Sequence, residues 1–125
     1  MTPMRTHTPF RHIDPRWLGD AAAGRKDLGL RLANLAIETL GEQIDACEST
    51  FHSQDDRAWA NISHNLKGTL AILGAKAAMQ QLQQLEHVDR REPHAVTAVA
   101  ALRATVGDVQ GELKRLLPVP GDQML

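Results

Sequence analysis

Three residues in one short stretch combine in a way that suggests chemistry: His64, Lys67 and Gly68. A helix advances about 100° per residue, so spacings of three and four residues make these side chains neighbours. An uncrowded imidazole is a nucleophile, and a lysine ammonium attracts anionic groups. A helical glycine costs about 1 kcal/mol relative to alanine, but Gly68 leaves the approach to the imidazole open. The combination indicates a nucleophile for phosphoryl groups; the alternative is an ordinary surface histidine beside an incidental glycine.

The helix that carries His64 has one apolar face. Within roughly ±40° of a single direction lie Trp59, Ile62, Leu66, Leu70 and Leu73. His64 points to the opposite side, and its own face is formed by Ala60, Gly68, Ala71 and Ala75. We therefore expect a nearly bare, solvent-facing strip around the imidazole.

This stretch resembles the signature of histidine-containing phosphotransfer (HPt) domains. In that family the pattern runs His-x-Leu-Lys-Gly-Ser/Thr, then small residues, then Leu-Gly-Ala. The chain has HNLKGT at residues 64–69 and LGA at residues 73–75, and its helical patterns extend the resemblance over residues 14–117. It departs from the family at Leu70, where a small residue is frequent, and at Ile72, where a polar one is. Ile72 lies at the edge of the His64 face, where we expect it to affect partner choice.

Composition favours a single helical domain. The chain has 125 residues, of which 42% are hydrophobic and only 3% aromatic, so alanine and leucine carry the core. The formal net charge of -1 gives no general attraction to nucleic acid or to an acidic membrane. Cys47 is the single cysteine, which fits a reducing compartment. There is neither a transmembrane run nor a signal peptide, so we expect a soluble cytoplasmic protein.

Apolar periodicity predicts four long helices, over residues 26–51, 56–73, 75–89 and 93–117. Short connections between them predict an all-α, antiparallel four-helix bundle, with a short leading helix that starts at Asp14-Pro15. In HPt domains such a helix caps the bundle near the active histidine. We expect a flexible arm over residues 1–13, the bundle over 14–117 and a loose tail over 118–125.

The same periodicity predicts which side chains face the core. In the first long helix these are Leu28, Leu32, Leu35, Leu40, Ile44, Cys47 and Phe51. In the third they are Ala78, Leu82, Leu85 and Val88, and in the last Val96, Val99, Leu102, Val106, Val109, Leu113 and Leu116.

Glu86 is the second candidate site residue, because it lies about 40° from the direction of Leu82 and can lean toward the His64 helix. HPt domains often carry Gln or Glu at this distance after the histidine. A carboxylate there would accept a hydrogen bond from Nδ1–H of His64 and leave Nε2 as the nucleophile. The alternative is a solvent-facing glutamate.

Other chemistries lack their motifs. No two histidines stand at i, i+4 with a carboxylate, as a zinc site would require, and the Glu-x-x-His pairs of a di-iron bundle are missing. There is no phosphate-binding glycine loop. We therefore expect no metal, no cofactor, no ATP site and no autokinase activity.

The resemblance implies a phosphorelay intermediate. A receiver domain, expected to belong to a hybrid sensor kinase, would pass its phosphoryl group to His64, which would hand it to the receiver of a response regulator. Lys67 would lie near the phosphoryl oxygens, and the receiver would dock over Ala60, Asn61, Gly68, Ala71, Ile72 and Ala75. Two alternatives stay open, a receiver-binding adaptor that carries no phosphate and a purely structural helical bundle.

Overall fold

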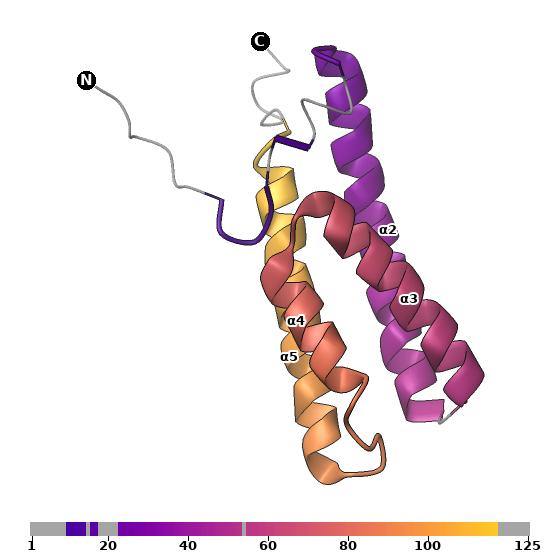
Figure 1. Cartoon of the computed structure of the whole chain (residues 1–125). Helices are drawn as coiled ribbons and strands as arrows, with labels where there is room; N and C mark the ends of the chain where they lie inside the picture. Colours follow the sequence, from indigo (N-terminus) through magenta and orange to yellow (C-terminus); the bar gives the residue numbers. More distant parts are fainter. Residues whose placement is uncertain (1–9, 15, 18–22, 54, 118–125) are drawn as a thin grey trace.

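The computed structural model describes residues 10–14, 16–17, 23–53 and 55–117, and this part of the chain is all-α. Its helices are α2 (Lys26–Ser53), α3 (Asp56–Leu73), α4 (Lys76–Leu85) and α5 (Pro93–Lys114). Consecutive helices run antiparallel, and α5 returns to pack against α2 (Figure 1). The predicted four-helix bundle is confirmed.

The ends of α3 are fixed by local signals, which is why its predicted bounds are confirmed. Asp55 caps the start: its side chain accepts a hydrogen bond from the backbone N–H of Ala58 at 3.1 Å. Gly74 ends the helix with φ at 70°, a left-handed conformation that glycine adopts without strain. Because α3 starts and stops at these residues, the register of His64 relative to the core is fixed.

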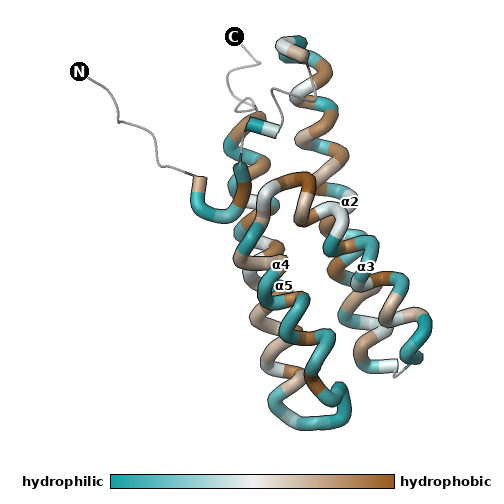
Figure 2. Tube along the Cα trace, viewed as in Figure 1, coloured by the Kyte–Doolittle hydropathy of each residue, from teal (hydrophilic) through white to brown (hydrophobic). Residues whose placement is uncertain are grey.

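The core lies between the four helices and is built mainly from leucine, with alanine and valine at the closer contacts. Leu66, Leu70 and Leu73 of α3 are buried with Leu40 of α2 and Leu102 of α5. At the end near the α2–α3 connection, Phe51 and Trp59 meet edge to face with ring centroids 5.2 Å apart. The loop between α4 and α5 lies outside this core and is largely hydrophilic (Figure 2).

Two of the residues that were predicted to face the core are exposed instead, and Leu28 and Leu32 are only half-buried. Leu35 is 59% exposed and Val96 is 53% exposed. On α5 the buried residue of the first turn is Ala95, which lies one residue earlier and is aligned with Val99 and Leu102. On α2 the buried residue near Leu35 is Ala33. In both helices a small residue occupies the closely packed position and the larger neighbour is turned outward.

Helix α4 ends at Leu85, four residues before the predicted end at Asp89. The Asp89 side chain accepts a hydrogen bond from the backbone N–H of Arg91 at 3.0 Å, and its carbonyl accepts one from the N–H of Glu92 at 3.0 Å. Aspartate side chains compete with helical hydrogen bonding in this way. The predicted helix over 93–117 likewise stops early, at Lys114.

Residues 10–14 pack against one end of the bundle instead of extending as a free arm. Ile13 is buried in the core, and the backbone N–H of Asp14 donates to the carbonyl of Leu73 at 2.9 Å. Figure 1 shows this segment beside the end of α5 and the α3–α4 turn. Arg16 and Trp17 are helical, but Pro15 and residues 18–22 lie outside the described residues, as do residues 1–9 and 118–125. The predicted leading helix therefore falls largely outside the described chain.

Candidate functional site

His64 lies on α3 with its side chain in solvent, as predicted. The residues around it on the outer surface of α3 are also exposed; they are Ala60, Asn61, Gly68, Ala71 and Ile72. Ile72 is 67% exposed, which makes it the most exposed large apolar side chain in the described chain. We call these five residues together with His64 the α3 outer strip.

Gly68 leaves real space beside the imidazole. A Cβ atom built at this position would meet no atom within 4 Å outside its own helix turn. The glycine is therefore not required for packing within the bundle. Because Gly68 has no side chain, the surface one turn from His64 is open.

Ala75 was predicted to lie on the same face, and this prediction is wrong. Its exposed fraction is 0%, and it joins the core cluster. The reason is that α3 stops at Leu73 and the left-handed Gly74 redirects the chain, so the periodicity of 100° per residue no longer applies to Ala75. Its carbonyl accepts from the N–H of Met79 at 3.0 Å, which makes Ala75 part of the start of α4.

Lys67 and Glu86 form an ion pair between α3 and the end of α4. Lys67 Nζ lies 2.9 Å from Glu86 Oε1, and the two side chains are 30% and 31% exposed. Glu86 had been expected to accept a hydrogen bond from His64, whereas the structure pairs its carboxylate with the lysine. Lys67 was expected to lie near the phosphoryl oxygens, and in the structure its ammonium is paired with this carboxylate. An orienting role of Glu86 toward the imidazole stays a prediction.

Comparison with known protein families gives one match: the Hpt domain family matches residues 31–112. The match covers α3 and α4 completely and most of α2 and α5, and it includes His64 and its strip. The chain belongs to the Hpt domain family. No curated protein and no solved structure matches the chain. Hpt domains have a phosphotransfer role in phosphorelays and interact with receiver domains.

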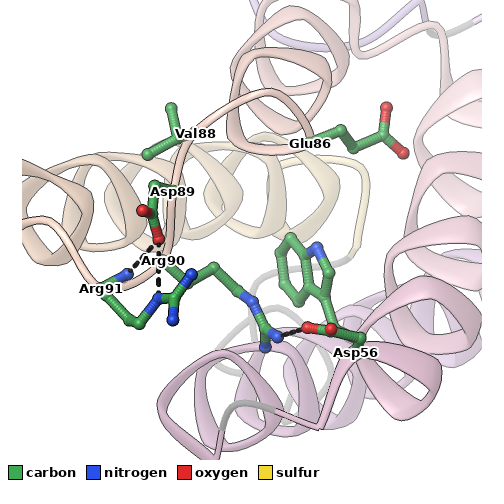
Figure 3. A pocket seen from close by; sticks show the side chains of 7 residues that line it. Asp56, Glu86, Val88, Asp89, Arg90 and Arg91 are labelled. Atoms are coloured by element: carbon green, nitrogen blue, oxygen red, sulfur yellow. Dashed lines mark hydrogen bonds and ion pairs between the residues drawn. The ribbon is translucent and has the colours of Figure 1, made fainter.

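The Hpt domain also has an open cleft of about 540 Å³ between the start of α3 and the α4–α5 loop. It is lined by Asp56, Trp59, Glu86, Val88, Asp89, Arg90 and Arg91. Figure 3 shows Arg90 extending across the cleft to Asp56, while the carboxylate of Glu86 points away from the arginines. Glu86 therefore belongs to the edge of the cleft, near α3.

Arg90 ties the α4–α5 loop to the rest of the Hpt domain. Its guanidinium pairs with Asp56 and donates to the carbonyls of Thr50 and Phe51, at 3.3 and 3.5 Å, at the end of α2. Its side chain is only 10% exposed. Arginine suits this position because its planar group has five donors. The loop that begins at Glu86 is consequently anchored at its middle.

Glu112 anchors residues 11–13 and was missed by the sequence analysis. Its carboxylate accepts from the backbone N–H groups of Arg11, His12 and Ile13 at 3.0, 2.8 and 3.2 Å, and from His12 Nδ1 at 2.8 Å. Burial raises the pKa of Glu112, but the hydrogen bonds outweigh burial, and the pKa lies below its usual value. A signal existed: Glu112 falls on the apolar face of α5, between Val109 and Leu113.

The described residues contain no group of three or more histidine, cysteine or acidic side chains that could hold a metal ion. In the same part of the chain, no helix is both long enough and apolar enough to span a bilayer. Cys47 is buried in the core, and burial raises the pKa of its thiol to about 12, so it stays in the unreactive protonated form.

Proposed function

We propose that His64 is the phosphoryl acceptor of this Hpt domain. It takes the group from the aspartyl phosphate of a receiver domain, expected to belong to a hybrid sensor kinase, and passes it to the receiver of a response regulator. The observation that supports this proposal is an exposed histidine beside the open position of Gly68, in a chain of the Hpt family.

The transfer requires a neutral imidazole. Its Nε2 lone pair attacks phosphorus in line, a P–N bond forms, the P–O bond to the aspartate breaks, and the carboxylate leaves with the electron pair. In the second transfer the aspartate of the response regulator attacks the same phosphorus, and the imidazole is the leaving group. The chain itself supplies position and one ammonium, that of Lys67. The bound Mg²⁺ and lysine of the receiver, which the family resemblance implies, supply most of the charge stabilisation.

The α3 outer strip is the proposed docking surface for both receivers. Ala60, Gly68 and Ala71 are small and exposed, so they allow the receiver backbone to approach the imidazole closely. Asn61 offers a polar contact at one end of the strip, and Ile72 offers an apolar contact at the other. Ile72 is where we expect discrimination between receivers to arise.

A labelling experiment tests the proposal. A receiver carrying radioactive phosphate should label the wild-type chain, ATP alone should not, and the label should be lost in acid and kept in base. The His64→Gln variant should take up no label and should melt like wild type, because the side chain is in solvent. The control is His94→Gln, which removes another exposed histidine on α5 and should be labelled normally.

The outcomes separate the remaining functions. Undiminished labelling of His64→Gln would refute the assignment of the acceptor. Receiver binding to the wild-type chain without any acid-labile label would indicate an adaptor that carries no phosphate.

A further inference from the structure

The ion pair between Lys67 and Glu86 places a carboxylate next to the ammonium that the phosphoryl group would use. Glu86 directly follows α4, and its N–H donates to the carbonyls of Leu82 and Gln83, each at 3.2 Å. Its backbone is therefore fixed by the helix end, and its carboxylate reaches Lys67 Nζ at 2.9 Å. The pair connects α3 with the end of α4, so it helps to hold these two helices together at the site.

Phosphorylation of His64 would introduce a second anion near the same ammonium. Side chains three residues apart on a helix have Cβ atoms about 5–6 Å from each other, so a phosphoryl group on His64 lies within reach of Lys67. By analogy with other phosphorylated side chains, this group carries about 1.5 to 2 negative charges near neutral pH. It must then share Lys67 with Glu86 or displace Glu86 from it.

The other cations near Glu86 are already committed in the described structure. Arg90 pairs with Asp56 and with carbonyls of α2, and Arg91 pairs with Asp89. If the phosphoryl group took Lys67 away from Glu86, the Glu86 carboxylate would have no available cation to replace it, because both arginines that line the cleft already have partners. The carboxylate would also repel the phosphoryl group.

We propose that Glu86 is a positioning residue that lowers the affinity of His64 for the phosphoryl group by holding Lys67. In the free state it orders the ammonium, and in the phosphorylated state it competes for it. The phosphohistidine is thereby a better donor to the next receiver than it would be beside a neutral side chain. This inference rests on the proposed function of His64.

The size of the effect follows from the exposure of the pair. Ion pairs with solvent access contribute about 0.2–1 kcal/mol. Converted at 1.4 kcal/mol per factor of ten, the upper part of this range is a change of about two- to fivefold. We therefore expect Glu86→Gln, which keeps the shape of the side chain and removes its charge, to raise the equilibrium constant for phosphorylation of His64 by about two- to fivefold.

Phosphoramidate is a probe that needs no receiver. His64 Nε2 attacks its phosphorus, the P–N bond of the reagent breaks, and ammonia leaves with the electron pair after protonation of the nitrogen. The forward rate with phosphoramidate and the reverse rate with added ammonium, both followed by ³¹P NMR, give the equilibrium constant. The matched control is Glu38→Gln on the exposed side of α2, which makes the same change in net charge and should leave the constant unaltered.

Two further measurements separate competition for Lys67 from a general charge effect. The increase caused by Glu86→Gln should shrink in a Lys67→Gln background, and it should shrink in high salt, where surface charges are screened. An unchanged constant in Glu86→Gln, or an equal increase with and without Lys67, would overturn the role of Glu86. If the wild-type chain acquires no label on His64, the proposed function itself fails, and this outcome is distinct from the previous two.

Discussion

Substitution of Gly68 by glutamine separates docking from folding. Gly68 lies inside α3 and Gly107 lies inside α5, both are exposed, and a Cβ atom at either position meets nothing within 4 Å. Replacing a helical glycine by a good helix former should stabilise the folded chain by up to about 1 kcal/mol, because less backbone entropy is lost on folding. We expect this gain for both Gly68→Gln and Gly107→Gln. For a domain of this size it corresponds to a rise in melting temperature of up to about 4 °C.

The two variants should differ in phosphoryl transfer. The glutamine at position 68 stands one turn from His64, where the receiver must bring its phosphorus to within about 3–3.5 Å of the imidazole. A side chain in this place must be pushed aside or must keep the receiver away. We expect Gly68→Gln to slow transfer and weaken receiver binding at least about tenfold, equivalent to about 1.4 kcal/mol. Gly107→Gln should transfer at the wild-type rate.

The assay needs a melting curve and a time course of label transfer for each variant. Equal stabilisation together with unequal transfer supports the α3 outer strip as the docking surface. Transfer at the wild-type rate by Gly68→Gln would refute this use of the strip. Unfolding of Gly68→Gln with a stable Gly107→Gln would refute the open environment assigned to Gly68.

Two predictions concern the attachment of residues 10–14. The pKa of Glu112 is lowered on folding, so its stabilisation is full above the unfolded value near 4.5 and is lost as the pH falls through the lower folded value. Glu112→Gln should therefore lower the free energy of unfolding by about 1–3 kcal/mol at pH 6 and by less at pH 3. Chemical unfolding at both pH values measures this difference, and an equal loss at the two pH values would contradict the charge-dependent attachment. Gly74→Ala should lower the free energy of unfolding by about 1–3 kcal/mol, because φ is 70° and the new Cβ would lie 2.8 Å from Asp14 Cβ. An unchanged melting temperature would contradict this contact.

The parts of the fold that depend on local signals could be predicted from the sequence. An aspartate cap, a glycine stop and a clear apolar stripe determine α3, so its bounds and the exposure of His64 were both predicted. Helix α2 starts at the predicted residue and ends two residues after the predicted end. Such signals act within a few residues of each other and need no knowledge of the neighbouring helices.

The contacts between elements could not be read from periodicity. Ala75 was assigned to the wrong face because a helical angle was continued past Gly74. Glu86 was placed correctly near α3, but the residue it pairs with depends on where α4 ends. Hydrogen bonds in the following loop determine that end. Leu35 was counted with the core because it is apolar, although it stands five residues before Leu40 and so points about 140° away from it, whereas Ala33 points only about 20° away and is buried.

This division between local and distant determinants has a consequence for the site. The proposed nucleophile His64, the ammonium of Lys67 and the proposed docking strip all lie on α3, and local signals hold them in register. The groups that adjust them come from elsewhere: Glu86 from the end of α4, and Asp14 from the segment that contacts Leu73 and Gly74 at the end of α3. Under the proposed function, substitutions at these outer positions should change how readily His64 releases the phosphoryl group, or how firmly the end of α3 is held. Such substitutions leave His64 and the proposed docking surface unaltered.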